Sequence, residues 1–197
     1  MPSGVSGTLE FRSTDYSPGV GGARFRLTYS ETYDISGNYS DITFTKFEVA
    51  GIGLYGRCVL SGKITANGTE IIKKQDVDIG LVASGDNNFV EMNASSVGLP
   101  QTVRVSHNSD GSKTIAVAIS ANGYDYFNLW FAGPTTGAGF AAASQNIVLT
   151  NIPRGMVRIY NGSSWDRYSV QIYNGSSWDR YRPYVYNGSS WEPYDGG

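Results

Sequence analysis

Cysteine and histidine are nearly absent from this sequence of 197 residues, which contains one of each. The single cysteine, Cys58, can form neither a disulfide framework nor a cysteine zinc site within one chain. It stands in an apolar run, and because free cysteine is among the most buried residue types, we expect its thiol in the core. A β domain of this size buries enough apolar surface to fold without a covalent crosslink.

Catalytic chemistry has little to draw on, because His107 is the only imidazole available to a serine or cysteine nucleophile. It begins the stretch 107–113, in which Asn-Ser and Asp-Gly pairs are typical of turns, so we expect a loop between two strands there. Asn108 and Asp110 before Gly111 match a fragment of a calcium-binding loop, but the further ligand and the distal glutamate are missing. We therefore expect no catalytic residue, no bound metal and no cofactor.

A basic surplus and long apolar runs are also missing. Lysine and arginine number 15 against 17 aspartates and glutamates, whereas a protein that coats nucleic acid needs positive charge on one face. No segment approaches the ~20 apolar residues that cross a bilayer, and residues 1–5 lack the basic and apolar blocks of a signal peptide. We expect no nucleic-acid partner, no membrane insertion and synthesis in a cytoplasm.

Short segments of alternating polarity dominate the first part of the chain, without any long stretch of helical spacing. An Asn67-Gly68 pair between two of them is typical of a tight hairpin. This pattern predicts an all-β domain over residues 1–154, an antiparallel β-sandwich that is jelly-roll-like. The expected strands are residues 7–12, 24–31, 41–49, 54–64, 69–74, 77–82, 88–92, 101–106, 114–121, 126–131 and 140–149.

A repeat array follows over residues 155–197. Pro153 and Gly155 interrupt the strand pattern and mark the boundary. Beyond them, residues 157–169, 170–182 and 183–195 are near-identical units with a period of 13, each with Asn-Gly-Ser-Ser between a β-branched and an aromatic run. That period is too short for the familiar solenoid and propeller repeats, so each unit predicts one β-hairpin, in which Asn-Gly tolerates the positive φ angles of a tight turn.

A lone hairpin is marginally stable in water. We therefore expect the hairpins to pair into one meander, or with copies from other chains. Within a meander, Trp165, Trp178 and Trp191 would lie two strands apart, about 9.5 Å, and form a ladder on one face.

The aromatic residues of the repeats are the candidate binding residues, and two interpretations stay open. In one, they fill a small strand-rich core. In the other, they are exposed and stack on sugar rings, while Asp166, Arg167 and their equivalents bind hydroxyls, with avidity from repetition. The candidates are Tyr160, Trp165, Tyr168, Tyr173, Trp178, Tyr181, Tyr186, Trp191 and Tyr194.

Several stretches of the first domain resemble an uncharacterised β-sandwich module of minor structural and tail proteins of siphoviruses that infect Gram-positive bacteria. The matching stretches are residues 22–29, 64–68, 105–113 and 147–154. The HNSDGSK loop and the closing strand that runs into IPR are the most specific parts. The YNGSSW repeats are similar to the C-terminal tails of tail and fibre proteins of phages from gut Firmicutes. No catalytic residues are established for that module.

The resemblance implies a non-enzymatic virion structural protein, a tail-tip, baseplate or head fibre or decoration component. Such a protein would be made in the host bacterial cytoplasm and exposed on the particle. Its expected partners are other virion proteins and further copies of itself, with a trimer the most plausible state because fibre-like phage proteins are frequently trimeric. One alternative is a carbohydrate-binding receptor-binding protein that recognises host cell-wall glycans. A weaker one is a polysaccharide-degrading enzyme, although the acidic residues are too scattered to place a catalytic pair.

Overall fold

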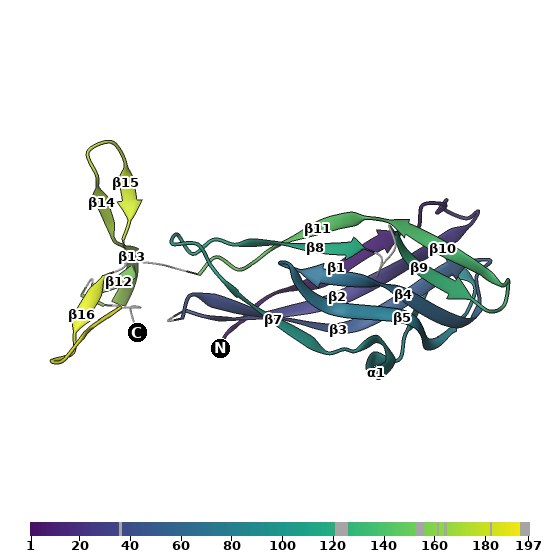
Figure 1. Ribbon diagram of the computed structural model, residues 1–197. Coiled ribbons are helices and arrows are strands. Elements are labelled where there is room, and N and C mark those ends of the chain that lie inside the picture. The colour runs from purple at the N-terminus through teal and green to yellow at the C-terminus, as the bar shows by residue number, and fades with distance from the viewer. Residues whose placement is uncertain are drawn as a thin grey trace.

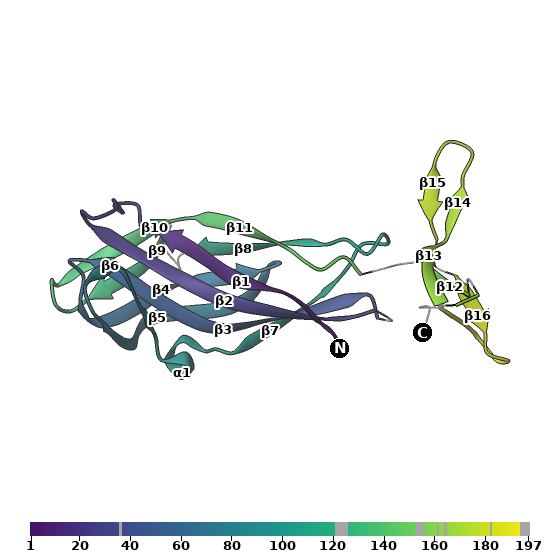
Figure 2. The same ribbon diagram turned by 180° about the vertical axis from the view of Figure 1, so that it is seen from behind.

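The computed structural model describes residues 1–35, 37–120, 126–152, 156–160, 162–163, 165–181 and 183–193, with only the backbone described at 126, 156–160, 165–169 and 180. Its elements form an antiparallel sandwich followed by hairpins, as Figure 1 shows and Figure 2 repeats from behind. The expected all-β fold is confirmed. No helix in these described ranges is long and apolar enough to cross a membrane.

The first sheet is built on a meander of three consecutive strands, β1, β2 and β3, which pair antiparallel in that order. Two later strands, β6 and β7, pair with different stretches of the free edge of β3. The strands are β1 (Ser3–Arg12), β2 (Gly22–Asp34), β3 (Tyr39–Ile52), β6 (Gly85–Glu91) and β7 (Gln101–Ser106).

The second sheet is centred on β4, which pairs with β5 along one edge and with both β8 and β9 along the other. Strands β11 and β10 continue the sheet beyond β8 and β9. The strands are β4 (Gly56–Ala66), β5 (Thr69–Val82), β8 (Thr114–Ser120), β9 (Tyr126–Phe131), β10 (Thr136–Ala141) and β11 (Ala143–Val148).

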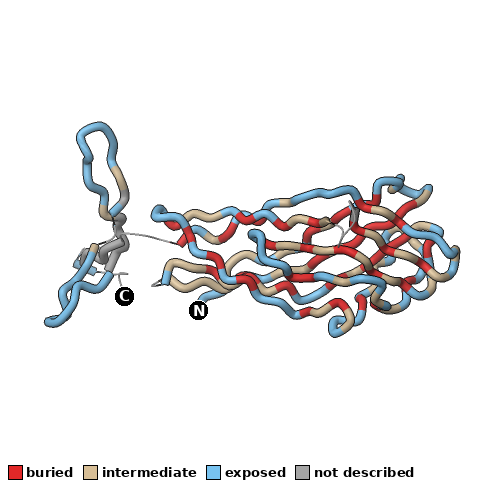
Figure 3. The backbone as a smooth tube through the Cα atoms, viewed as in Figure 1, coloured by how far each residue is buried: buried red, intermediate tan, exposed pale blue. Residues whose placement is uncertain are grey.

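The core between the sheets is organised around Phe25. Its ring stacks on Phe11 and Phe47 of its own sheet at 5.0 and 4.9 Å between centroids. It also contacts Phe127 and Phe140 of the facing sheet at 4.9 and 5.3 Å. Figure 3 shows buried and more exposed positions alternating along the strands, so the period of two in the sequence corresponds directly to an inward and an outward face.

Cys58 and the Asn67-Gly68 pair both lie where the sequence predicts. Cys58 is fully buried, and burial, assisted by Asp78, raises the pKa of its thiol to about 12, so the thiol is protonated and inert near neutral pH. Asn67 and Gly68 both have positive φ, 49° and 80°, and join the paired ends of β4 and β5. The tight hairpin predicted there is confirmed.

Strand β5 is continuous where the sequence predicts two strands, 69–74 and 77–82. The polar residues between them form a bulge instead of a turn, since the β4–β5 register shifts there and Asp76 has a φ of 54°. Ser61 stabilises the bulge by donating to the Asp76 carboxylate at 2.7 Å and accepting from the Asp76 N–H at 2.8 Å.

The single strand predicted over 140–149 is instead two strands, β10 and β11, because each pairs with a different partner, β9 or β8. A short helix, α1 (Ala94–Val97), was also not predicted. Asn93 caps it by accepting hydrogen bonds from the N–H groups of Ser95 and Ser96, and Gly98, with a φ of 93°, ends it. One turn is too short to show a helical period.

The predicted C-terminal hairpins are present, but each is a separate two-stranded sheet. Among the described residues they do not join into one meander, so the expected tryptophan ladder across a single sheet is wrong. The hairpins are β12 (Met156–Tyr160) with β13 (Trp165–Ser169), β14 (Gln171–Tyr173) with β15 (Trp178–Arg180), and β16 (Tyr184–Tyr186) with β17 (Trp191–Pro193).

Candidate functional site

The loop of the second hairpin is organised by the side chain of Asn174. Its Oδ1 accepts hydrogen bonds from the N–H groups of Ser176 and Ser177, both at 2.9 Å, while its own N–H donates to the Ser177 carbonyl at 3.0 Å. Gly175 supplies positive φ, 101°. Asn187 makes the same contacts in the third hairpin. The Asn-Gly-Ser-Ser turn is confirmed, although asparagine acts through its amide and not through its φ angle.

The carboxylate after each tryptophan completes this loop. Asp179 accepts from Asn174 Nδ2 at 2.5 Å and from Ser177 Oγ at 3.2 Å. In the third hairpin, Glu192 takes the same position and accepts from Asn187 Nδ2 at 2.5 Å. These carboxylates therefore stabilise the loop, and the prediction that the equivalents of Asp166 bind sugar hydroxyls stays a prediction.

Each described hairpin pairs one tyrosine with one tryptophan across its strands. Tyr173 lies directly opposite Trp178, with ring centroids 5.3 Å apart and tilted by 46°. Tyr186 and Trp191 repeat this arrangement at 5.5 Å and 48°. The tryptophans are 66% and 69% exposed, and both tyrosines are exposed as well. The aromatic residues thus form an open surface and do not fill a core.

The remaining candidate residues are less fully placed. Tyr181 follows β15, is exposed, and donates its N–H to the Val170 carbonyl at 2.9 Å. Tyr160 and Trp165 are opposite each other in the β12–β13 register, and Tyr168 lies further along β13. The side chains of these three residues, and all of Tyr194, lie outside the described residues.

A second polar constellation is buried in the sandwich. Ser40 Oγ lies 2.5 Å from Glu31 Oε1 and 2.7 Å from His107 Nε2, and His107 Nδ1 lies 2.8 Å from the Gly111 carbonyl oxygen. Glu31, Ser40 and His107 are all buried. The predicted loop is confirmed, since β7 ends at Ser106 and β8 begins at Thr114. The burial of His107 was not predicted, because nothing in a linear pattern indicates a partner on β2 or β3.

The order of these groups differs from that of a nucleophilic triad. Gly111 O can only accept, so Nδ1 carries a hydrogen, and Ser40 donates its single hydrogen to Glu31. Ser40 thus links the His107 ring to the Glu31 carboxylate. In this network Ser40 lies between the carboxylate and the imidazole, whereas a nucleophilic triad places the histidine between the serine and the carboxylate. In addition, Ser40 has no exposed surface. The arrangement is structural.

Glu31 connects this network to two further segments. Its Oε2 accepts from the N–H of Val5 at 2.9 Å and from the N–H and hydroxyl of Thr150 at 3.0 and 2.7 Å. Burial raises the pKa of Glu31, but hydrogen bonds from Ser40, Thr150 and Val5 outweigh burial and hold its pKa below the usual 4.5. The ionised carboxylate thereby joins β1, β2, β3 and the segment after β11.

The loop 107–113 packs against the segment through which the chain leaves the sandwich. Ile152 N–H donates to Gly111 O at 3.0 Å, and Leu149 N–H donates to Lys113 O at 2.9 Å. Gly111 is required, since its φ is 83° and any Cβ would overlap the Ile152 carbonyl. We call Glu31, Ser40, His107, Gly111, Thr150 and Ile152 the exit anchor.

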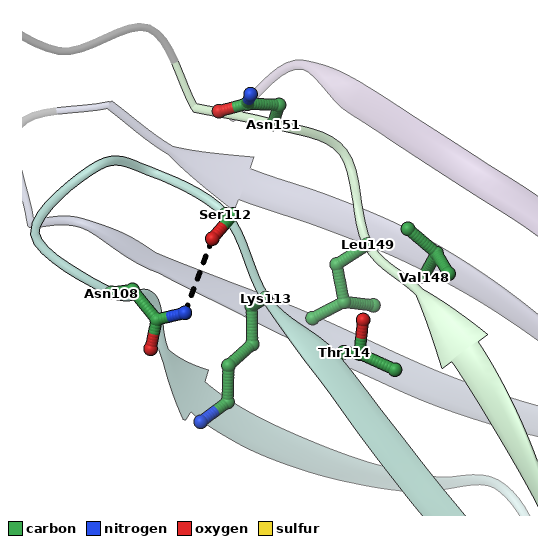
Figure 4. Close-up of a pocket in the computed structure, with 7 residues that line it drawn as sticks. All are labelled: Asn108, Ser112, Lys113, Thr114, Val148, Leu149 and Asn151. Atoms are coloured by element: carbon green, nitrogen blue, oxygen red, sulfur yellow. Dashed lines mark hydrogen bonds between the residues drawn. The ribbon is translucent and has the colours of Figure 1, made fainter.

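The exit anchor brings together residues 105–113 and 147–152, the described parts of the two most specific stretches of the family resemblance. A pocket of about 420 Å³ opens beside them, and Figure 4 shows its lining, including the hydrogen bond from Asn108 to Ser112. Neutral polar and aliphatic residues dominate that lining, with one lysine: Asn108, Ser112, Lys113, Thr114, Val148, Leu149 and Asn151. No pair of carboxylates lines it.

The calcium-like fragment of this loop has a local role. Asp110 Oδ1 accepts from the N–H and the hydroxyl of Ser112 at 2.9 and 2.6 Å, as in an ordinary Asx turn. In the part of the chain that the structure describes, no group of three or more histidine, cysteine, aspartate or glutamate residues is arranged to hold a metal ion.

A buried arginine was another feature that sequence reasoning missed. Arg24 lies over the rings of Tyr16 and Phe89, at 5.2 and 4.9 Å, and forms ion pairs with Glu10 and Asp86 at 3.1 and 2.9 Å. It connects β2 to the loop after β1, through Tyr16, and to β6, through Asp86 and Phe89. Only the surrounding aromatic residues distinguish it from an exposed arginine, and they come from distant parts of the sequence.

No protein-family model, no curated protein and no solved structure matches this chain. The function must therefore be inferred from the geometry of the hairpins and of the exit anchor.

Proposed function

We propose that this chain is a non-enzymatic outer structural protein of a bacteriophage particle, in a tail-tip, baseplate or head fibre or decoration position, that uses its hairpins for assembly or host attachment. The observation that carries the proposal is the exposure of Trp178 and Trp191 on separate two-stranded hairpins. The likeness of the first domain and of the repeats to phage structural proteins supports the placement on a particle.

Exposed aromatic surface in a repeated unit is typical of an interface. Tryptophan and tyrosine supply a large contact area at a low conformational-entropy cost, and contiguous exposed apolar surface marks interaction sites. Repetition adds avidity, because the second contact forms at the effective concentration set by the first.

The sandwich supplies a rigid base for this surface. Its aromatic core joins both sheets, and the exit anchor fixes the chain at Thr150 and Ile152, directly before the boundary. The sandwich therefore fixes the chain as far as Ile152.

A triple variant, Trp165→Ala, Trp178→Ala and Trp191→Ala, tests the proposed function. The matched control is Leu81→Ala with Val148→Ala, since these apolar side chains are equally exposed, at 70% and 69%, but lie on the sandwich. We expect the triple variant to lose at least ten-fold in co-sedimentation with purified Gram-positive cell walls or with particles that lack the protein, and the control to lose nothing. Full binding by the triple variant on both targets contradicts the proposal.

A carbohydrate-binding receptor-binding protein is the second candidate, favoured by the open face of each Tyr–Trp pair, which suits stacking on a sugar ring. Loss of cell-wall binding in the tryptophan variants, with assembly intact, supports this candidate, whereas loss of assembly supports a purely structural role. A polysaccharide-degrading enzyme is a weaker alternative, and turnover of purified host polysaccharide would overturn the non-enzymatic proposal.

A further inference from the structure

The hydrogen-bond pattern of the second hairpin fixes which backbone groups point outward. Asn174 pairs with Ser177, and Tyr181 N–H donates to Val170 O, so both ends of the β14–β15 ladder are hydrogen-bonded positions. Antiparallel pairs alternate between hydrogen-bonded and non-hydrogen-bonded positions. The pairs Tyr173–Trp178 and Gln171–Arg180 are therefore non-hydrogen-bonded, and their N–H and C=O groups face the two outer edges.

The two edges of a hairpin differ in chemistry. The first strand, β14 or β16, is uncharged and has an exposed aliphatic residue at its centre, Ile172 or Val185. The second strand, β15 or β17, has a carboxylate at its centre, Asp179 or Glu192. Charged residues and proline on an edge strand prevent it from pairing with another strand. The second strand has this protection and the first strand does not.

Proline reinforces this difference in the third hairpin. Pro193 lies opposite Tyr184, at the position that Arg180 occupies in the second hairpin, where the N–H would face outward. Since proline has no N–H, this edge cannot donate a hydrogen bond to a further strand at that position. Tyr184 and Tyr186 on the opposite edge keep theirs.

We infer that the uncharged edges of β14 and β16 pair antiparallel with the same edges in a second copy of this chain. This inference rests on the proposed use of the hairpins for assembly, and it names the partner. Two hairpins would form one sheet of twice the width, which removes the marginal stability of a lone hairpin. Ile172 would face its counterpart, whereas pairing through β15 would place Asp179 opposite another Asp179, which is unfavourable.

Pairing of this kind closes on itself. The combined β14 sheet carries Asp179 at both outer edges, and the combined β16 sheet carries Glu192 and Pro193 at both, so each sheet stops growing at two hairpins. When both edges of one chain pair with the same second copy, the assembly closes at two copies. The two copies are related by a twofold axis, which favours a dimer over the trimer expected from fibre proteins. The aromatic faces stay open, because pairing uses edges, and they remain free for other contacts.

The test places proline either on the first strand of a hairpin or at the opposite position on its second strand. Gln171→Pro with Tyr184→Pro removes outward N–H groups from the uncharged edges. Arg180→Pro is the matched control, since Arg180 lies opposite Gln171 and the change copies Pro193. By light scattering across a concentration series, we expect the unmodified chain and the control to reach twice the chain mass of 21.3 kDa, and the double variant to stay at the chain mass.

A second pair of variants guards against local unfolding. Ile172→Lys with Val185→Lys leaves every backbone donor in place but puts like charges opposite each other, whereas Ile172→Thr with Val185→Thr keeps the edge neutral. The lysine variant should be monomeric and the threonine variant dimeric. A monomeric unmodified chain at all concentrations overturns the inference, as does a dimer or trimer that survives both the proline and the lysine changes.

The outcome is separable from the proposed function. The proline and lysine variants keep all three tryptophans, so they should still bind cell walls or particles, with affinity reduced only by the loss of avidity. If the chain is monomeric but binds through its tryptophans, the inferred edge pairing fails and the proposed function stands. If the chain dimerises through these edges but binds neither target, the proposed function fails and the inferred edge pairing stands.

Discussion

The sandwich and the hairpins are built from the same antiparallel pairing, yet they use aromatic residues in opposite ways. Phe25 has a second sheet above it and is buried between Phe47 and Phe127. Trp178 lies on a two-stranded sheet that no second layer covers among the described residues, and it stays in solvent. A β-rich sequence with many aromatics therefore does not by itself indicate a core. Whether a second layer exists decides between a core and a contact surface.

The largest expected effect of removing one aromatic ring is in the sandwich. Phe25→Ala should lower the free energy of unfolding by about 3–5 kcal/mol, because it removes a ring that touches both sheets. Trp178→Ala should leave that free energy nearly unchanged. Urea denaturation followed by far-ultraviolet circular dichroism measures both, and equal losses would show that the hairpin is part of the cooperative core.

A glycine comparison tests the exit anchor. Gly111→Ala should destabilise the sandwich by about 1–3 kcal/mol or more, because alanine is strained at this φ and its Cβ overlaps Ile152 O. Gly19→Ala is the control, since Gly19 also has a positive φ, 72°, but open space around it. The difference in melting temperature between the two variants isolates the overlap. No difference would mean that the loop moves without cost.

Acid should weaken the sandwich through Glu31. Its folded-state pKa is lowered, so its carboxylate stabilises the fold above the unfolded value near 4.5, and that stability is lost as pH falls through the folded pKa. We expect the urea midpoint to drop below pH 4.5, and to drop less steeply in Glu31→Gln, which starts from a lower stability. Parallel acid slopes in the two proteins would assign the acid sensitivity to other carboxylates.

The smallest effect compares two Asn-Gly pairs. Asn67→Gly should be nearly neutral, because Asn67 contributes a positive φ that glycine adopts freely. Asn174→Gly should destabilise its hairpin by about 1–2 kcal/mol, since the two hydrogen bonds that the amide oxygen accepts in the loop are lost. Near-ultraviolet circular dichroism of the Tyr173–Trp178 pair reports the second change. Similar effects at both sites would argue that the Asn174 amide contributes little.

This pair of turns also shows how far the sequence predicts the structure. The alternation of polarity predicts most strands, with β7 and β9 at their observed bounds, and Asn-Gly predicts both hairpin turns. The dipeptide alone does not distinguish them, because the loop length decides the geometry: Ala66 pairs with Thr69, whereas Tyr173 pairs with Trp178. The two serines after Asn174 were the available signal, since their N–H groups suit a side-chain acceptor.

The exit anchor could not be predicted in the same way. Glu31, Ser40 and His107 come from three separate elements, and each has an ordinary strand or loop context in the sequence. Their proximity follows from the order of strands in the sheet, which local patterns do not encode. The hairpins are the opposite case, because the hydrogen bonds of their loops are local, and there the sequence predicts the two strands and the turn between them.

One consequence of the exit anchor concerns how this domain can be joined to others. Val5 N–H, near the start of the sandwich, donates to both Glu31 and the Thr150 hydroxyl, at 2.9 and 3.2 Å. The incoming and outgoing ends of the domain are thus hydrogen-bonded side by side. A domain with adjacent ends can be inserted into a surface loop of another protein without separating the flanking residues of its host. The geometry therefore suits insertion of the whole domain into another protein as well as attachment of hairpins at its end.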